Sequence, residues 1–271
     1  MRVRLGEFDV DLGAARDLSI PVRFDDPAFQ AGARAFSLPA PTTHAVEGGG
    51  FVGDVRRGGS CNCETHTFTP HGDGTHTEGP GHILQSRRPV VVRVVPRLLG
   101  DSVDDVAGNH RHDDLVVDTD GVAAGLAAVL KADGRPELLP TALIVATAPG
   151  AQRRRQQHSG TNPPYLTPDA ATFIRERGFV HLLVDLPSLD RENDGGLLSA
   201  HHAFFDVPPG ATDSNVADRS VTELIAVDDD VAEGVYALFL QLAPIVADAA
   251  PSRPLIAPLL TPLETARGAA P

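Results

Sequence analysis

Three histidines and two carboxylates are gathered among small residues between Pro70 and His82. His76, Glu78 and His82 are separated by even numbers of residues, so in an extended segment their side chains leave the same face. His71 has the opposite parity, but the glycines beside it permit a turn or bulge that would rotate its imidazole into the same site. The segment therefore offers a row of side chains that can bind a metal ion.

The chemistry of this row favours a catalytic metal site over a closed structural one. Imidazole nitrogen and carboxylate oxygen, without thiolate, suit zinc first and manganese as the alternative. A catalytic centre also needs an open position for water, and small residues let a metal or ligand approach the backbone closely. The competing interpretation is a glycine-rich surface turn whose histidines and glutamate are solvated.

Other polar residues stand near the ends of expected buried elements. Asp185 and Asp190 follow an apolar run of strand length, where ligands gather in α/β sheets, although both can equally hydrogen-bond the turn. The residues from Arg153 to Arg155 belong to a polar stretch that we expect to be a solvated loop. The sequence alone assigns none of them to the metal site.

The overall composition excludes several classes of protein. The 271 residues include 36 acids and 23 bases, for a formal net charge of -13, so the chain lacks the electrostatic footprint of a phosphate-backbone binder. The charged N-terminus does not read as an export signal, and the longest apolar stretch, Val235 to Ala250, is interrupted and too short to span a bilayer. Two cysteines cannot form a disulfide framework, which fits a reducing compartment. We expect a cytoplasmic protein with a small-molecule substrate and with neither nucleic acid nor membrane as partner.

The expected regular elements alternate in type along the chain. Dense apolar or β-branched runs predict strands, and capped stretches predict helices. Strands are expected at 90–95, 142–147, 180–186 and 235–242, with a further candidate at 17–22, and helices at 122–132, at 168–178 and at 220–227. Continuous apolar strands separated by capped helices favour an α/β architecture with some strands covered on both faces.

The two ends of the chain differ from this pattern. The first 60 residues form a loop-rich N-terminal arm in our interpretation, because residues 25–59 are rich in Pro, Gly and Ala. Residues 249–271 form a Pro-rich tail without periodicity, which we expect to wrap the surface. Neither a repeat nor a long linker divides the chain, so we predict one domain over residues 1–271.

The histidine segment resembles the motif H-x-G-T-H-x-D-x-P-x-H of the cyclase family of metal-dependent hydrolases, which includes bacterial kynurenine formamidases and isatin hydrolases. Gly74-Thr75-His76, Pro80 and His82 fit the motif in register, and Glu78 stands where the family usually has Asp. The position of the first motif histidine is Gly72 here, and the imidazole is displaced to His71. Further segments resemble family motifs in the same order: Asp17 to Pro21, Val184 to Asp190, Ala200 to Phe205, and Glu223 before Leu224.

The resemblance implies a set of ligands and one catalytic side chain. His71, His76 and Glu78 would hold one divalent metal, and Glu78 would bridge to a second metal held by His201 and Glu223. His82 would be the catalytic imidazole.

Alternatives stay open at four of these positions, one of them His82, which could simply hydrogen-bond a backbone carbonyl. Asp73 could replace the displaced first ligand, and His202 could take the place of its neighbour His201. Ser220 and Glu223 also match a capping box, in which the glutamate stabilises a helix start and binds no metal.

The resemblance also implies a fold and an activity. The fold would be an α/β domain with a mixed-sheet or barrel-like core flanked by helices, the swivelling β/β/α type of the family. The activity would be arylformamidase-like hydrolysis of an amide-like C–N bond in a small carbonyl substrate such as a formamide or cyclic amide. A metal-dependent lyase or cyclase, and a metal-binding scaffold that has lost catalysis, are the alternatives. A homo-oligomer, dimer or tetramer, with the N-terminal loop as an exchanging arm, is the expected assembly.

Overall fold

Seven strands of the computed structural model close into a barrel. The structure describes residues 1–5, 8–24, 33–78, 89–104, 106, 110–134, 140–209, 219–243 and 249–260. The barrel strands are β8 (His76–Glu78), β9 (Pro89–Arg93), β12 (Ala142–Ala146), β14 (His181–Val184), β15 (Ser220–Glu223), β16 (Gly234–Leu242) and β17 (Ala249–Leu260). Their order is β17-β16-β9-β12-β14-β15-β8, and β8 pairs again with β17 to close the ring. Strands β9, β12, β14 and β15 are parallel, and the other pairings in the ring are antiparallel.

Smaller elements surround this barrel. Strands β1 (Arg2–Leu5), β2 (Phe8–Asp11) and β3 (Arg16–Asp17) extend the sheet from β17, while β10 (Arg97–Leu98), β11 (Leu115–Val117) and β13 (Tyr165–Leu166) form a separate small sheet. The helices are α1 (Pro70–Asp73), α2 (Thr119–Asp133), α3 (Gly150–Arg153), α4 (Pro168–Glu176) and α5 (Ser199–Phe205). Short 3₁₀ turns occupy Leu12–Ala14, Val55–Arg57 and Leu99–Asp101.

Alternate residues of the parallel strands face two different apolar clusters. Val90, Val92 and Val145 pack with residues of α2, α4 and α5 outside the barrel, whereas Val91 and Ile144 pack in a cluster that contains no residue of these helices. Both faces of these strands are therefore buried, which explains why they read as continuous apolar runs. The predicted α/β class with a barrel-like core flanked by helices is confirmed.

The helices that position the core carry the expected end signals. Thr167 caps α4 through its side chain, which accepts a hydrogen bond from Ala170 N, and proline follows at the first helical position. Asp118 caps α2 in the same way, and Gly134 ends it in a left-handed conformation. The strands expected at 90–95, 142–147, 180–186 and 235–242 are confirmed as β9, β12, β14 and β16.

The helix predicted at 220–227 is wrong, because this segment contains strand β15. Its residues pair in parallel with β14 and in antiparallel with β8. The strand ends where Leu224 adopts a positive φ of 54°. The Ser-x-x-Glu pattern of Ser220 and Glu223 therefore does not start a helix here, and the capping-box interpretation of Glu223 is wrong.

The prediction that the Pro-rich tail wraps the surface is wrong for residues 249–260, which form the barrel strand β17. The carbonyl of Pro254 accepts a hydrogen bond from Leu18 N, so the ring nitrogen of this residue faces the same side, away from β16. Pro258 is separated from Pro254 by an even number of positions on the strand, so its ring nitrogen faces the same side. These two prolines therefore remove no hydrogen bond from the long β16–β17 ladder. Residues 261–271 lie outside the described part.

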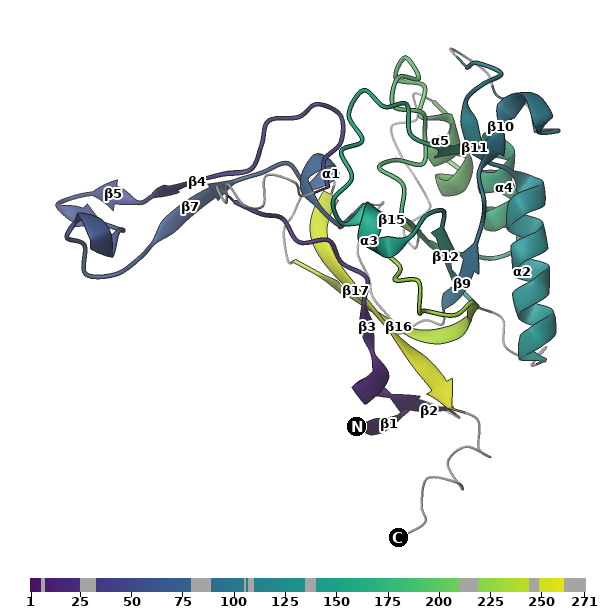
Figure 1. Cartoon of the computed structure of the whole chain (residues 1–271), viewed down its shortest axis with the longest axis horizontal. Helices are drawn as coiled ribbons and strands as arrows, with labels where there is room; N and C mark the ends of the chain where they lie inside the picture. Colours follow the sequence, from purple (N-terminus) through teal and green to yellow (C-terminus); the bar gives the residue numbers. More distant parts are fainter. Residues whose placement is uncertain are drawn as a thin grey trace, which may run out of the picture.

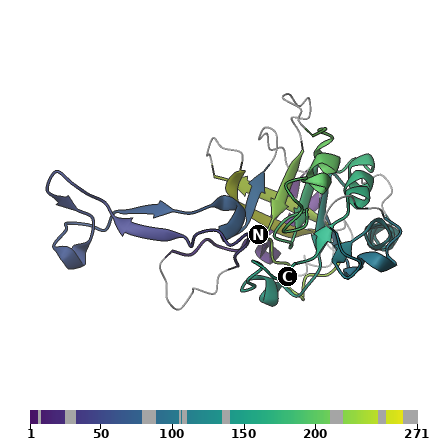
Figure 2. The same ribbon diagram turned by 90° about the horizontal axis from the view of Figure 1, so that it is seen from above.

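The N-terminal segment contains more regular structure than we expected. A two-stranded ribbon of β4 (Thr42–Ala45) and β7 (Glu64–Thr67) projects from the body and carries β5 (Glu47–Gly48) and β6 (Phe51–Val52) at its end (Figures 1 and 2). We call residues 42–67 the ribbon arm. The strand expected at 17–22 is wrong except for Asp17, which ends β3; residues 18–24 form neither strand nor helix. Residues 25–32 lie outside the described ranges.

Within the described ranges, no helix is both long and apolar enough to cross a membrane. The cytoplasmic location stays a prediction.

The expected solvated arginine loop is partly buried. Arg153 is only 3% exposed, and its Nε donates to Asp185 Oδ2 at 3.1 Å. The same carboxylate also accepts hydrogen bonds from the backbone N–H groups of Thr147 and Ala148. Asp185 therefore pairs with an arginine inside the fold and is not placed at the histidine segment.

A buried histidine beside this pair should make stability depend on pH. Burial, together with the charge of Arg153, lowers the pKa of His158 to about 4. Its unfolded-state pKa is near 6.5, so between pH 6.5 and 4 the unfolded chain binds a proton that the folded chain does not. This histidine alone should therefore lower the free energy of unfolding by about 3 kcal/mol as the pH falls through that range.

Urea unfolding of the wild type and of His158→Gln at pH 7 and pH 4.5 measures this contribution. The loss of stability on acidification should be smaller in the variant. An equal loss in both proteins would show that His158 does not cause it.

Candidate metal centre

The register between β8 and β15 places three acidic or imidazole side chains on one face. Glu223 lies directly opposite His76, and Glu78 lies two residues further along β8 on the same face. On the other face the hydroxyls of Thr77 and Thr222 are 2.6 Å apart. A slip of one residue between the two strands would break this hydroxyl pair and turn Glu223 to the face opposite His76 and Glu78.

The short helix α1 brings His71 to this face. Gly74 follows α1 with a φ of 154°, and a Cβ at this position would lie 2.7 Å from Ile20 O, so glycine is required for the tight turn. The turn places His71 Nδ1 3.0 Å from Glu78 Oε2 and sets the His71 and His76 rings edge to face, 4.9 Å apart. The turn that the glycines were expected to allow is present.

Helix α5 brings His201 from the far part of the chain. His201 Nε2 lies 2.7 Å from Glu78 Oε1 and 3.4 Å from Glu223 Oε1. Its Nδ1 is 2.5 Å from Asp190 Oδ2, and Asp190 also accepts hydrogen bonds from the backbone N–H groups of Ala200 and His201. Asp190 therefore fixes both the start of α5 and the orientation of this imidazole, as a carboxylate behind a metal-ligating histidine does.

Five side chains form two overlapping groups, which we call the His/Glu cluster. His71, His76 and Glu78 make the first group, and Glu78, His201 and Glu223 make the second. Within each group the candidate ligand atoms lie within 4.8 Å of one another. Because Glu78 belongs to both groups, the arrangement can accept one ion or two.

The donors of the His/Glu cluster fit a divalent metal. His76 is 1% exposed, and its Nε2 has no hydrogen-bond partner within the described ranges although it lies 3.5 Å from Glu223 Oε2. An imidazole nitrogen that is buried without a partner is costly unless a cation binds it. Imidazole nitrogens combined with carboxylate oxygens suit zinc or manganese.

The cluster also shifts the protonation of its own members. Burial alone would raise the pKa of Glu78, but hydrogen bonds from His201 and His71 outweigh it and hold that pKa well below its usual range. Burial alone would lower the pKa of His201, but hydrogen bonds with carboxylates, first of all with Asp190, raise it well above its ordinary value. Without a cation the cluster therefore favours the charged form of His201, in which both ring nitrogens carry a proton, and metal binding must release one of these protons.

The two alternative residues lie outside both ligand groups. Asp73 is buried, and its Oδ2 accepts a hydrogen bond from Thr69 N, away from the cluster. His202 Nδ1 donates to Val207 O at 2.6 Å and takes no part in the cluster. His82 lies outside the described residues, so its catalytic role stays a prediction.

Sequence reasoning missed the specific supporting roles of the 185–190 turn. Leu189 N donates to Glu223 Oε1 at 2.8 Å, and Asp190 orients His201. The position of Asp190 after a buried strand was the available signal, but it pointed equally to a ligand and to a turn.

Comparison with known proteins gives the family and the fold of the chain. The family described as "Putative cyclase" matches residues 16–191. None of the curated proteins compared with the chain matches it.

Solved structures share the fold at low identity. A predicted metal-dependent hydrolase from Bacillus stearothermophilus is 14% identical with a TM-score of 0.55, covering 89% of this chain and 97% of its own. Isatin hydrolase A from Labrenzia aggregata, bound to benzyl benzoate, is 17% identical with a TM-score of 0.55, over 90% of this chain and 94% of its own. Isatin hydrolase A from Ralstonia solanacearum is 14% identical with a TM-score of 0.51, over 90% and 92%.

The family match covers more than half of the 271 residues and contains the first three motif segments, which are Asp17 to Pro21, the histidine segment and Val184 to Asp190. The resemblance inferred from the motifs is thereby confirmed: the chain belongs to the cyclase family.

Proposed function

We propose that this protein is a metal-dependent hydrolase that cleaves an amide-like C–N bond in a small carbonyl substrate, such as a formamide or a cyclic amide. The observation that carries the proposal is the pair of overlapping ligand groups joined by Glu78. Solved structures similar to the chain include a predicted metal-dependent hydrolase and isatin hydrolases. Zinc is the metal we expect first, with manganese second.

The chemistry divides between the cation and the protein. A divalent cation held by the His/Glu cluster would polarise the substrate carbonyl and bring the pKa of bound water toward 7. His71, His76 and Glu78 would hold it, with Glu78, His201 and Glu223 able to hold a second. Asp190 keeps the His201 ring in place, and the charged ring must lose one of its two protons before it can bind a cation.

His82 has the general acid–base role in our proposal. It would accept a proton from the attacking water or donate one to the departing nitrogen, since imidazole titrates in the working range. The water oxygen bonds to the carbonyl carbon, the C–N bond breaks, and the nitrogen leaves as an amine with the added proton. The products are a carboxylate and an amine, joined in one molecule when the substrate is cyclic.

The geometry of Glu78 bears on the alternative that catalysis has been lost. Glutamate is one methylene longer than the family's usual aspartate, by roughly 1.5 Å, which could spoil a bridge between two metals. In this chain its two oxygens reach His71 at 3.0 Å and His201 at 2.7 Å. The longer side chain therefore fits between the two groups, which favours a working bridge.

A product assay tests the proposal. Metal-free protein, reloaded separately with Zn²⁺ and Mn²⁺, is given a panel of formamides, lactams and lactones in ¹⁸O-labelled water. We expect at least one formamide or lactam to be opened with one labelled oxygen in the carboxylate product. Product without label would indicate a lyase or cyclase, and bound metal without turnover of any compound would indicate a scaffold.

We also propose that the ribbon arm packs against a second copy of the chain. All four residues of β7 are exposed, and the arm also exposes Phe51 and Val55. A two-stranded ribbon is marginally stable by itself in water, so a partner surface would stabilise it. The arm has three acids and two arginines, so its charge of -1 is small beside the -13 of the whole chain, which reduces repulsion between copies.

Light scattering coupled to gel filtration tests this assembly. The wild type should elute as a dimer or tetramer. A variant in which residues 46–63 are replaced by Asn-Gly, which keeps the β4–β7 pairing, should elute as a smaller species. A monomeric wild type would contradict the proposed assembly.

A further inference from the structure

The hydroxyl of Thr75 connects the two strands that carry His76 and Glu223. Thr75 directly precedes His76 and is 3% exposed. Its Oγ1 donates to Leu224 O at 2.5 Å and accepts from Ile20 N at 2.7 Å. Leu224 directly follows Glu223, so the buried hydroxyl of Thr75 links the backbone next to Glu223 with the residue next to His76.

Leu224 is in a conformation that needs support. Its φ of 54° is left-handed, a conformation that brings the Cβ of a residue with a side chain too close to the following carbonyl oxygen. Its side chain is buried, and its N–H donates to Leu186 O at 2.9 Å. The donor to its carbonyl is the Thr75 hydroxyl. This turn sets the end of β15 and with it the direction of the Glu223 side chain.

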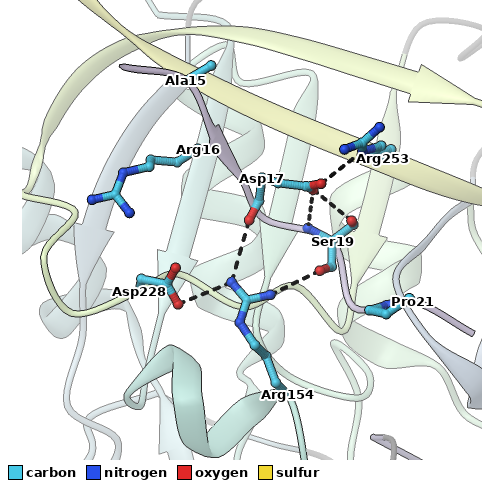
Figure 3. Close-up of a pocket in the computed structure, with 8 residues that line it drawn as sticks. All are labelled: Ala15, Arg16, Asp17, Ser19, Pro21, Arg154, Asp228 and Arg253. Atoms are coloured by element: carbon cyan, nitrogen blue, oxygen red, sulfur yellow. Dashed lines mark hydrogen bonds and ion pairs between the residues drawn. The ribbon is translucent and has the colours of Figure 1, made fainter. Parts of the chain in front are cut away.

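The second hydrogen-bond partner of the Thr75 hydroxyl, Ile20, belongs to a segment that arginine side chains hold in place. Figure 3 shows Arg154 and Arg253 beside the segment from Asp17 to Pro21. Arg154 Nη1 donates to Ser19 O at 3.1 Å, and Arg253 Nε donates to Asp17 Oδ2 at 2.8 Å. Ser19 bonds back to Asp17 through its N–H and its hydroxyl.

The pocket drawn in Figure 3 is lined by Arg16, Arg154 and Arg253. Each of these arginines has an acidic partner, so we assign them to holding the segment and not to binding a ligand. The segment in turn pairs with the strand beside the cluster, because Thr75 N donates to Ile20 O at 3.0 Å while Ile20 N donates to the Thr75 hydroxyl. The hydroxyl is thus held at a fixed point from which it reaches Leu224.

We infer that Thr75 is a positioning residue for the His/Glu cluster: its hydroxyl holds the Leu224 turn against the Asp17–Pro21 segment, and thereby keeps Glu223 opposite His76. The inference rests on the proposed metal site. Thr75 itself touches neither metal nor substrate in this role. Loss of a supporting hydrogen bond behind a metal site typically weakens metal binding 10- to 100-fold.

Calorimetric titration of metal-free protein with Zn²⁺ and with Mn²⁺ tests the inference. Thr75→Val keeps the shape and removes the hydroxyl, so it should bind at least one of the two cations about 10- to 100-fold more weakly than the wild type. Thr75→Ser keeps the hydroxyl and should bind within about threefold of the wild type. Urea unfolding of the metal-free variants separates a loss of affinity from a loss of stability.

The matched control is the double variant Thr77→Val, Thr222→Val. It removes two buried hydroxyls from the same strand pair, and among the described residues these hydroxyls bond to each other, on the face away from the cluster. Its stability can fall, but its metal affinity should stay within about threefold, since replacing both partners by apolar groups leaves no unsatisfied group.

Three results would overturn the inference. The first is wild-type metal affinity in Thr75→Val. The second is a loss of affinity in the double control equal to that in Thr75→Val. The third is a tenfold loss in Thr75→Ser, and this result remains decisive if the valine variant does not fold. A wild type that binds neither cation would instead refute the proposed metal site on which the inference rests.

Discussion

Replacing His76 by alanine should remove the bound metal and reduce turnover to the background rate. His76 lies at the centre of the first ligand group, and its buried Nε2 has no other partner within the described ranges. Loss of a direct ligand should weaken metal binding by more than about 100-fold, because even supporting residues account for 10- to 100-fold. Elemental analysis of the purified variant and its turnover of the best substrate measure the two effects.

His44→Ala provides the control for this experiment. His44 is an exposed imidazole on β4, outside both ligand groups, so its removal should change neither metal content nor turnover. If His76→Ala loses the metal but keeps full activity, the metal has no part in the reaction and the proposed mechanism is wrong.

Moving the first histidine to its usual family position should destroy the site and not improve it. In this chain the family position is Gly72, and a Cβ there would lie 2.7 Å from Leu38 Cδ1 and 3.2 Å from Ala35 O. The space that a histidine would need is therefore filled by the segment that packs on α1. The double variant His71→Gly, Gly72→His should lose metal affinity at least as strongly as His71→Ala.

The same crowding should lower stability, by roughly 1–3 kcal/mol as for other overpacked sites. Adding Leu38→Ala removes the nearer obstacle and should recover part of that loss, whereas the contact with the Ala35 backbone remains. Calorimetry for metal binding and urea unfolding for stability measure the two effects. Wild-type affinity in the double variant would refute our account of the displaced histidine.

Much of the fold could be predicted where local patterns and tertiary packing agree. Strands β9, β12 and β14 are buried on both faces and therefore read as short apolar runs. Helix α4 has its threonine cap and following proline next to each other in sequence. These signals depend on neighbours along the chain, so they are visible without the fold.

The errors arose where distant contacts decide the structure. Ser220 and Glu223 have the spacing of a capping box, but pairing with β14 and β8 makes their segment a strand. The prolines of β17 suggested a surface tail, although the ring nitrogen of Pro254 points away from β16 and so removes no hydrogen bond from the β16–β17 ladder. Arg153 looked solvated because its buried partner, Asp185, is far along the chain.

The candidate site could be predicted in part for the same reason. The common face of His76 and Glu78 follows from their even spacing on β8. That His201 and Glu223 reach the same point depends on strand register and on the placement of α5, so it came only from family motifs. The support from Asp190, Leu189 and Thr75 depends on hydrogen bonds that no spacing reveals.

A crystal structure of the protein soaked with Zn²⁺ or Mn²⁺, with anomalous data at the metal edge, tests the central claim most directly. We predict an anomalous peak bonded to His71, His76 and Glu78, with any second peak at Glu78, His201 and Glu223. A fully loaded crystal whose metal binds elsewhere, or whose first ligand is Asp73 in place of His71, would contradict the account.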